Sequence, residues 1–448
     1  MARILGRVLW TQSSGDLMET NVVIQGDVIQ VANDLPAKSV QCIITSPPYY
    51  NLRDYGIDGQ IGLEETPEVF IAKMVDVFRA LRRVLRDDGT LWVNLGDSYV
   101  NHSIPGGGDP TIGKRNIGKS KYRSTRVENL KPKDLMMMPA RVAIALQADG
   151  AVDARAMVMI ERIKTALLND YDNWDSIPLH TRHEIELLNS EWEQAHKGGW
   201  YLRSEIIWSK PNPMPESATD RPANAHEKVY LLSKKPRYFY DAESVKEKAV
   251  DSGTRKRDKT KYASTTDQSK PDSWLIDCNY AESGRNLRNV WTIATHPFAK
   301  AHFATYPPKL VEPCIKAGTS ERGCCPECGA SWVRVVEKSG GTIGKSWHDH
   351  NNDREMGLQQ MTPADIAKTK DGTYETKTIG WNPSCKCNAG DPVPSVVLDP
   401  FGGSCTTAEV ALRLNRSFIM IELSEPYCKI GRERILPYLD QFNLKLSP

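Results

Sequence analysis

Hydrophobic and polar positions change period several times between residues 20 and 100, and this pattern predicts strands that alternate with helices. Three short runs rich in β-formers, NVVIQ, VQCIITS and TLWVNLGD, predict strands, and a turn at Gly26-Asp27 leads from the first into a short helix. The segment TPEVFIAKMVDVFRALRRVLRDDG predicts a longer helix that begins at the N-cap Thr66 before Pro67 and ends at Gly89. Alternating strands and helices favour a parallel sheet covered on both faces.

The same alternation resumes beyond a Gly-rich stretch and continues to the C-terminal region. LMMMPARVAIALQADG predicts a helix, WYLRSEIIWSK a strand, and KVYLLSKKPRYFYD a pair of strands with a turn near Lys235-Pro236. PSVVLDPFGGSCTTAEVALRLNRSFIMIELSEPYCKIGRERI predicts a strand, a glycine turn, a helix, a second strand and a second helix. The chain shows no internal repeat.

Composition narrows the class of protein. The chain has 448 residues, of which 40% are hydrophobic, enough for one α/β core with insertions. No apolar run reaches the roughly 18 residues that a membrane span needs, and residues 1–16 lack the pattern of a signal peptide. We therefore expect no membrane partner and a cytoplasmic location, in which the ten cysteines are free or bound to metal rather than paired in disulfides.

The net charge of +2 indicates little about partners, but the charges are unevenly distributed. Residues 113–133 hold eight Lys or Arg against one Glu, and a second basic cluster follows at 254–262. Basic runs are commonly solvated loops, and these two, interleaved with Gly, Ser and Tyr, also suit contact with phosphates. Residues 151–198, with nine acidic and five basic residues, predict two helices that face solvent or a partner.

The C-terminal βαβ pattern has the features of a site for a nucleotide-like ligand. The turn Gly402-Gly403-Ser404 lets the backbone approach a ligand closely, and the next helix offers free N–H groups. Asp399 ends the first strand, and Glu422 ends the second, where an acidic side chain can accept hydrogen bonds from ribose hydroxyls. Neither G-x-G-x-x-G nor a P-loop is present. Because an acidic residue before the turn repels pyrophosphate but suits a cationic amino group, S-adenosylmethionine fits better than NAD or ATP.

Three motifs together resemble those of amino-directed DNA methyltransferases. DPFGGSCTT is similar to the family's cofactor motif, TSPPYY to its catalytic motif, and HFATYPPKLV to a motif around the methionyl part of the cofactor. Their order, with the catalytic motif first, is that of the permuted β-class, and the resemblance extends over most of residues 20–435. Cys405 departs from the pattern, because the family usually has Gly there.

The resemblance implies an α/β fold with a doubly wound, mostly parallel Rossmann-like methyltransferase sheet and an inserted target-recognition region. The cysteines described below add the expectation of a small zinc knuckle. The expected regions are a catalytic half at 20–100, a basic DNA-contacting loop at 101–135, core continuations at 136–150 and 199–240, the acidic helical insertion at 151–198, the target-recognition region at 241–290, a cofactor-side motif at 291–323, a Cys-rich zinc insertion at 324–390, and an S-adenosylmethionine-binding half at 391–448.

The expected reaction moves a methyl group from S-adenosylmethionine to the exocyclic amine of a base flipped out of double-stranded DNA. The catalytic residues would be Ser46, Pro47, Pro48 and Tyr49. The Ser46 hydroxyl and the Pro47 carbonyl accept hydrogen bonds from the amine, the prolines keep these acceptors rigid, and Tyr49 stacks on the base, with Tyr50 as the second choice.

The resemblance also assigns residues to the cofactor. Asp27 would hold the adenine amino group, Glu422 the ribose, and the segment from Phe303 to Tyr306 the methionyl end. The full set expected to bind the cofactor is Asp27, Phe303, Thr305, Tyr306, Asp399, Phe401, Gly403, Ser404 and Glu422.

The base that receives the methyl group is less strongly specified. Serine in the first catalytic position is commoner in relatives that modify the 4-amino group of cytosine, and aspartate in those that modify the 6-amino group of adenine. We therefore expect cytosine, with adenine as the alternative. Methylation of the cytosine ring carbon needs a Cys nucleophile beyond a strand, whereas Pro313-Cys314 lies in a segment with a helical pattern.

Four cysteines form two close pairs, Cys325-x-x-Cys328 and Cys385-x-Cys387, the pattern of a structural Zn²⁺ site with tetrahedral sulfur coordination. Free thiols are the alternative, and Cys324 is a substitute ligand. Because the four thiolates would leave no open position on the metal, a zinc hydrolase is a weaker interpretation.

DNA recognition is expected between the two halves. The residues expected to contact DNA are Lys114, Arg115, Lys121, Arg123 and Arg126, on phosphates or guanine edges. A homodimer and a cognate restriction endonuclease are partners compatible with the resemblance, in the cytoplasm of a prokaryotic or phage-infected cell. RNA and protein stay open as substrates, and the interpretation from another class is a non-catalytic DNA-binding protein on the same fold.

Overall fold

The fold is taken from a computed structural model of the chain. It describes residues 8–11, 17–100, 130–148, 178, 182, 199–216, 218–247, 284–296, 305–339 and 375–446. The chain forms two compact units. The larger unit comprises residues 1–240, 289–331 and 385–448, and the smaller comprises 241–288 and 332–384.

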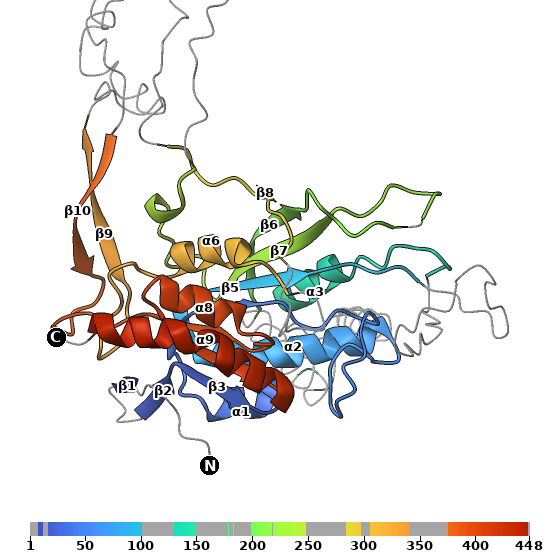
Figure 1. Cartoon of the computed structure of the whole chain (residues 1–448), viewed down its shortest axis with the longest axis horizontal. Coiled ribbons are helices and arrows are strands. Elements are labelled where there is room, and N and C mark those ends of the chain that lie inside the picture. Colours follow the sequence, from blue (N-terminus) through green and yellow to red (C-terminus); the bar gives the residue numbers. More distant parts are fainter. Residues whose placement is uncertain are drawn as a thin grey trace, which may run out of the picture. The chain divides into compact units, whose positions relative to one another are not determined.

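The larger unit is built on an eight-stranded mixed sheet (Figure 1). In spatial order its strands are β3 (Val22–Gln25), β12 (Ser417–Glu422), β11 (Val396–Asp399), β4 (Val40–Thr45), β5 (Leu85–Leu95), β7 (His226–Ser233), β6 (Tyr201–Ser209) and β8 (Val290–Thr292). The first five are parallel, β7 is antiparallel to both β5 and β6, and β8 is parallel to β6. The expectation of a mostly parallel α/β sheet is confirmed.

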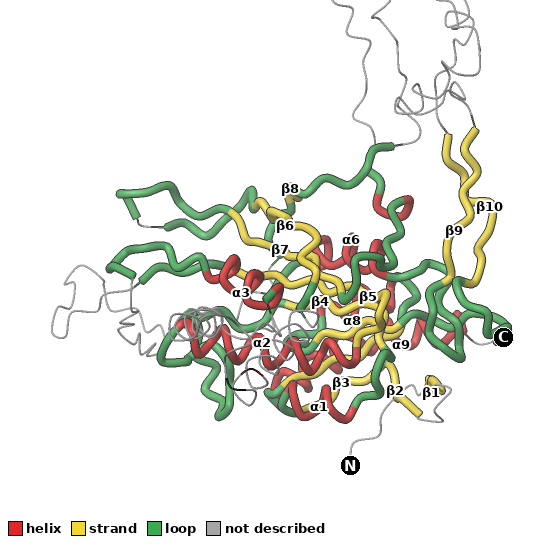
Figure 2. The backbone as a smooth tube through the Cα atoms, turned by 180° about the vertical axis from the view of Figure 1, so that it is seen from behind, coloured by secondary structure: helices red, strands yellow, loops and turns green. Residues whose placement is uncertain are grey.

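Helices cover both faces of this sheet (Figures 1 and 2). One row consists of α1 (Val28–Asp34), α2 (Pro67–Val84) and α3 (Met138–Gln147), and the other of α6 (Pro308–Gly318), α8 (Thr406–Arg413) and α9 (Glu425–Leu446). Because the central strands are buried on both faces, every residue of β4 is buried. Ile43 and Leu398 belong to the core that also contains residues of α1–α3, whereas Ile44 and Trp92 lie on the side of α6.

The end of α2 differs from the prediction. The helix ends at Val84, and β5 begins at Leu85, which has extended backbone angles. Gly89 therefore lies inside a strand. A Cβ there would come within 2.8 Å of the Gln41 carbonyl oxygen, so this glycine permits the close approach of β5 to β4 rather than ending a helix.

The predicted pair of strands around Lys235-Pro236 is wrong in its second half. Only β7 forms, and residues 234–240 have no strand. Both edges of β7 already pair with β5 and β6, so no edge is left for a hairpin partner. The segment is held instead by other bonds, including one from the Phe239 N–H to the Asp88 carbonyl at 2.8 Å.

The remaining described elements are short. In the larger unit, β1 (Val8–Thr11) pairs antiparallel with β2 (Leu17–Thr20). In the smaller unit, β9 (Trp332–Ser339) and β10 (Glu375–Pro383) form an antiparallel ribbon, and a 3₁₀ turn covers Glu243–Val245. This unit combines parts of the 241–290 and 324–390 regions. No helix of the described ranges is long and apolar enough to cross a bilayer.

Candidate active site and cysteine cluster

The catalytic motif lies at the carboxyl end of β4, where parallel strands commonly present functional residues. The Ser46 hydroxyl donates to the Tyr49 hydroxyl at 3.3 Å. The ring of Tyr49 lies against Gly96, where a Cβ would come within 2.5 Å of Cε2, so a side chain at this position would displace the ring. Tyr50 is 1% exposed, and its ring lies 5.5 Å from that of Phe70. Tyr50 is therefore a core residue, and naming it as second choice for stacking was wrong.

The hydroxyl of Tyr49 meets a carboxylate and an amide that the sequence did not suggest. Tyr49 donates to Glu227 Oε2 at 2.7 Å and lies 3.2 Å from Asn94 Oδ1. Lys210 binds the other carboxylate oxygen of Glu227. Burial raises the pKa of Tyr49 well above its ordinary value, and the neighbouring Glu227 raises it further. The phenol therefore stays neutral and acts as a donor at physiological pH.

Asp399, at the end of β11, is at the centre of a second buried network. Its carboxylate is 0% exposed and accepts hydrogen bonds from Thr45 Oγ1 at 2.8 Å, Tyr306 Oη at 2.5 Å, Thr407 Oγ1 at 2.7 Å and the Phe401 N–H at 3.1 Å. The network thus ties the residue before Ser46 to the cofactor motif. Burial raises the pKa of Asp399 in spite of these hydrogen bonds.

The glycine turn after β11 is also held by an acidic residue. Glu422, at the end of β12, accepts hydrogen bonds from the Gly403 N–H at 2.7 Å and the Ser424 N–H at 2.8 Å. Gly403 has a φ of +50°, which glycine adopts without strain. Burial raises the pKa of Glu422, and the charge of Asp399 adds to this rise. Within the described part of the chain, neither Asp399 nor Glu422 has an ion pair.

Cys405 stands where the family that the sequence resembles has Gly, and it adopts the left-handed backbone conformation that favours glycine. Its φ is +59°, and its side chain is 0% exposed. A Cβ at Gly431 of α9 would lie 2.3 Å from its Sγ, so the sulfur occupies the space that the missing side chain leaves. Cys405 therefore changes the packing beneath α9 and leaves the turn itself intact.

The structure describes some of the other residues predicted to bind the cofactor. The carboxylate of Asp27 caps α1, accepting from the Ile29 and Gln30 N–H groups at 3.0 and 3.1 Å. Since β3 lies beside β12, Asp27 lies at the same sheet edge as Glu422. Thr305 precedes Tyr306 in the segment leading into α6, and Ser404 is buried. Phe303 lies outside the described residues, as do Lys114, Arg115, Lys121, Arg123 and Arg126.

A small pocket lies beside Thr45 and Tyr306 of the Asp399 network and Asn94 of the Tyr49 network. Its lining also includes the apolar residues Trp92, Val229 and Leu310. The acidic strand ends and the glycine turn suit a cationic ligand that carries a ribose, as S-adenosylmethionine does.

The four paired cysteines come together at the opposite, amino edge of the sheet. The sulfur atoms of Cys325, Cys328, Cys385 and Cys387 all lie within 4.8 Å of one another. Zinc–sulfur bonds of about 2.3 Å place tetrahedral ligands roughly 3.8 Å apart, so this donor set fits the metal. Cys324 is outside the cluster, and its sulfur lies 3.9 Å from the Pro394 carbonyl oxygen.

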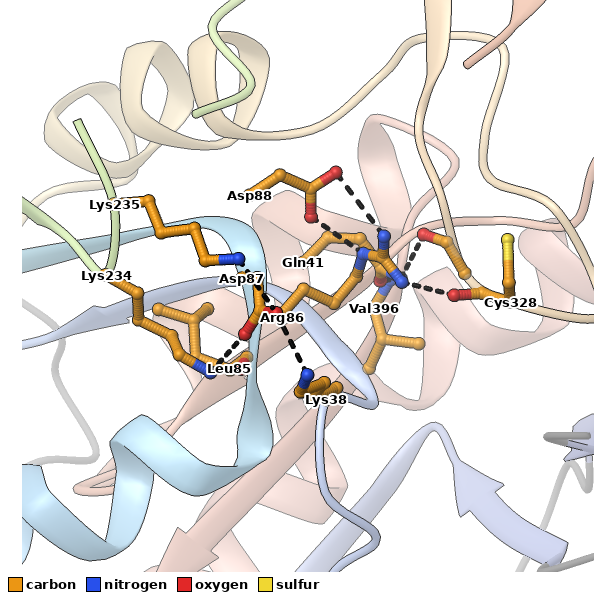
Figure 3. Close-up of polar contacts among 11 residues, drawn as sticks. Lys38, Gln41, Leu85, Arg86, Asp87, Asp88, Lys234, Lys235, Cys328 and Val396 are labelled. Atoms are coloured by element: carbon orange, nitrogen blue, oxygen red, sulfur yellow. Dashed lines mark hydrogen bonds and ion pairs between the residues drawn. The ribbon is translucent and has the colours of Figure 1, made fainter. Parts of the chain in front are cut away.

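Side chains from two strands hold the cysteine cluster in place (Figure 3). Arg86 of β5 donates to the Cys328 carbonyl. Gln41 of β4 donates to the Gly329 carbonyl at 3.0 Å and accepts from the Val396 N–H at 2.7 Å. The cluster is therefore fixed to the amino ends of β4, β5 and β11, away from the strand ends that carry Ser46 and Asp399.

Comparisons with known proteins show which family the chain is similar to. The DNA methylase (N6_N4_Mtase) family model matches residues 40–325 and 389–433. The Type II methyltransferase M.Cfr9I of Citrobacter freundii is 37% identical over 66% of this chain and 72% of its own length. M.SmaI of Serratia marcescens is 31% identical over 94% of both chains. A solved structure, the cytosine-N4-specific PvuII DNA methyltransferase, aligns with 95% of this chain and 93% of its own at 14% identity and a TM-score of 0.44.

The sequence matches, which extend over most of the chain, define an α/β DNA methylase. The chain belongs to this family of DNA amino-methyltransferases, which use S-adenosylmethionine as methyl donor and DNA as substrate. The resemblance inferred from the three motifs is thereby confirmed.

Proposed function

We propose that the protein methylates the 4-amino group of cytosine at a specific site in double-stranded DNA. The observation that carries this proposal is the pair of acceptors at the end of β4. Ser46 presents its hydroxyl oxygen there, and no described residue donates a hydrogen bond to the adjoining carbonyl of Pro47. Serine at this position, which in the family is commoner with cytosine, favours that base over adenine.

The two acceptors address the main chemical difficulty of the reaction. The lone pair of an exocyclic amine is delocalised into the base and is a poor nucleophile. Hydrogen bonds from both N–H groups, to Ser46 and to Pro47, pull the nitrogen toward tetrahedral geometry and free the lone pair. Pro47 and Pro48 hold these acceptors rigidly, and Tyr49 offers a ring on which the flipped base stacks.

S-adenosylmethionine supplies the methyl group as part of a sulfonium. We propose that Glu422 binds its ribose, Asp27 its adenine amino group, and Phe401 and the Gly403-Ser404 turn its remaining surface. Phe303, Thr305, Tyr306 and Asp399 would enclose the methionyl end. The buried negative charge of Asp399 and Glu422, which have no described ion pair, supports a cationic ligand at this edge.

Nucleoside mass spectrometry on DNA incubated with the protein and S-adenosylmethionine tests the proposal. We expect 4-methylcytosine. A 6-methyladenine product would leave the role of the two acceptors intact and show that the base is adenine. Absence of any methylated base, together with intact cofactor binding, would favour the non-catalytic DNA-binding protein.

The acceptors themselves are tested by the double variant Ser46→Ala with Tyr49→Ala. We expect methyl transfer to be lost and the dissociation constant for S-adenosylmethionine to stay within about threefold of the wild-type value, because neither side chain is assigned to the cofactor. Retained transfer in this variant would remove the proposed role of the motif.

We also propose that the cysteine cluster binds one structural Zn²⁺ through Cys325, Cys328, Cys385 and Cys387. Four thiolates complete the tetrahedral coordination and leave no position for a catalytic water. Elemental analysis of the purified protein should give about one zinc per chain. Cys385→Ser should lose it, whereas Cys324→Ser, outside the cluster, should keep it.

The basic residues Lys114, Arg115, Lys121, Arg123 and Arg126 are proposed to contact DNA. Replacing any one of them should reduce the salt dependence of DNA binding by about one unit of slope if it contacts a phosphate.

The relatives' description as Type II methyltransferases supports a cognate restriction endonuclease acting on the same site in the cytoplasm of a prokaryotic cell. A homodimer is testable by sedimentation, and resistance of host DNA to cleavage tests the pairing.

A further inference from the structure

Four polar groups form a continuous chain that begins at Ser46 and ends at Lys210. Ser46 Oγ donates to Tyr49 Oη at 3.3 Å, and Tyr49 Oη donates to Glu227 Oε2 at 2.7 Å. Lys210 Nζ binds Glu227 Oε1 and lies 4.5 Å from the centre of the Trp208 ring. Because Ser46 donates outward, its oxygen lone pairs are left to face the amine.

A second Tyr–Glu–Lys set, formed by residues of β6 and β7, shows what is particular to the first. Tyr230 donates to Glu205 Oε2 at 3.2 Å, and Lys228 binds Glu205 Oε1 at 2.8 Å. The side chain of Glu205 is 46% exposed, whereas that of Glu227 is only 16% exposed. No described hydroxyl of the catalytic motif reaches Glu205. The enclosed set ends at Ser46, and the exposed set does not.

The reaction leaves a proton that must go somewhere. When the amine nitrogen bonds to the methyl carbon, the carbon–sulfur bond breaks and its electron pair stays on sulfur. The nitrogen becomes positively charged and strongly acidic, and one of its two protons must leave to restore the neutral methylated amine. Of the two acceptors proposed for the amine, only Ser46 is a hydroxyl, and a serine alone cannot keep a proton.

We propose that Glu227 is the final acceptor of this proton, through a relay over Ser46 and Tyr49, an inference that rests on the proposed methylation of an amino group. The amine gives its proton to Ser46 Oγ, Ser46 gives its own to Tyr49 Oη, and Tyr49 gives the phenolic proton to Glu227 Oε2. Both hydroxyls end neutral, and the carboxylate ends as a carboxylic acid that later releases the proton to water. Glu227 is thus a positioning and proton-accepting residue that acts through Tyr49.

The charges around Glu227 fit this role. Lys210, at the end of β6, holds Oε1, so that Oε2 is directed at Tyr49. Asn94, which faces Tyr49 from β5, is uncharged. The positive charge of Arg53, in the loop after the catalytic motif, partly offsets the rise in the pKa of Tyr49. Because Tyr49 remains protonated at neutral pH, it can pass a proton along without first becoming a phenolate.

Glu227→Gln separates a relay from a purely structural contact. Glutamine keeps the shape and an oxygen that accepts from Tyr49, but it cannot take up a proton. The single-turnover rate of tritiated methyl transfer to unmethylated genomic DNA should fall by about 100-fold or more. Glu227→Asp, which keeps a carboxylate that can take up the proton, should retain more of the rate than Glu227→Gln.

Tyr49→Phe is the second test, since it keeps the stacking ring and removes only the hydroxyl. We expect a similar loss of rate, with binding of S-adenosylmethionine unchanged. The matched controls are Glu205→Gln and Tyr230→Phe, which disrupt the exposed set and should leave the rate within about threefold of wild type.

A Glu227→Gln enzyme with a wild-type rate overturns the relay, and so does a Tyr49→Phe enzyme with an undiminished rate. If Glu227→Gln does not fold, Tyr49→Phe decides. A wild-type protein that methylates no DNA overturns the proposed function itself, and the relay with it, and is distinguished from the other outcomes by the absence of any product.

Discussion

The pKa of Asp87, at the amino edge of the main sheet, and the pKa values of Asp399 and Glu422, at the carboxyl edge, are shifted in opposite directions. At the amino edge, Asp87 binds Lys38 at 2.9 Å, Lys234 at 3.0 Å and Lys235 at 3.2 Å (Figure 3). These lysines hold the pKa of Asp87 below its ordinary value, although burial opposes them. At the carboxyl edge, burial raises the pKa of Asp399 and of Glu422.

The difference separates a structural edge from a functional one. Neighbouring cations of the same chain neutralise the acid of the amino edge, so little charge is left for a ligand. At the carboxyl edge, Asp399 and Glu422 accept hydrogen bonds only from neutral groups of the described residues, and their charge stays available to a cationic ligand. Substitutions at the two edges should therefore affect stability and activity in different proportions.

The largest effect is expected from Asp399→Ala. Loss of the carboxylate leaves the hydroxyls of Thr45, Tyr306 and Thr407 buried without their acceptor, which should lower the free energy of unfolding by about 2–4 kcal/mol. Because Thr45 immediately precedes Ser46, methyl transfer should also fall by about 100-fold or more. Urea denaturation and single-turnover transfer measure the two effects. A variant that loses stability but keeps transfer would show that this edge, too, is only structural.

Gln41→Leu is the matched substitution at the amino edge. Gln41 is 2% exposed, and its loss leaves the Gly329 carbonyl and the Val396 N–H without their partner. We expect a loss of about 2 kcal/mol in the free energy of unfolding. At a temperature where the variant is folded, the transfer rate and the affinity for S-adenosylmethionine should equal those of wild type. A substantial loss of transfer would contradict the separation of the two edges.

Periodicity predicted most strands and helices of the sheet, because a strand buried on both faces reads as an unbroken apolar run and an amphipathic helix as a 3.6-residue period. It failed at Gly89 and after Lys235, where pairing with distant strands decides the structure. Glycine there permits contact with Gln41, and the edges of β7 are already occupied. Such constraints are not written in the local sequence.

The candidate site shows the same limit. Ser46, Asp399 and Glu422 were identifiable because each follows a predicted parallel strand inside a motif. Glu227 was not, because it lies near the start of an antiparallel strand whose position beside β5 places it next to Tyr49, 178 residues earlier in the chain. An acidic residue that opens an otherwise apolar strand, in the run HEKVYLLS, is the signal that was available.

Cofactor binding should depend on pH with the sign set by the carboxyl edge. A carboxyl whose pKa is raised in the ligand-free protein holds its proton more tightly, whereas a cationic ligand favours the ionised form. Affinity for S-adenosylmethionine should therefore weaken as the pH falls through the raised pKa values of Asp399 and Glu422, by up to about tenfold per pH unit for each group that must ionise.

Calorimetric titrations in buffers of different ionisation enthalpy, between pH 4.5 and 7.5, would show proton release on binding. Glu422→Gln should reduce the number of protons released. Affinity that does not change with pH over this range would mean that neither carboxyl titrates with the ligand.

The smallest effect is expected from Asp87→Asn at the amino edge. The side chain of Asp87 is 33% exposed, so solvent screens its contacts with the three lysines, and we expect a loss of about 1 kcal/mol or less at pH 7. Because the pKa of Asp87 is lowered in the folded protein, this stabilisation is present above the ordinary value of about 3.9 and disappears as the pH falls below it. Because the carboxyl of Asp87 in the folded protein is still ionised at pH 3, urea denaturation of both proteins should show a smaller difference at pH 3 than at pH 7. Methyl transfer should be the same for both, and a change of more than about threefold would place Asp87 among the functional residues and end the contrast between the edges.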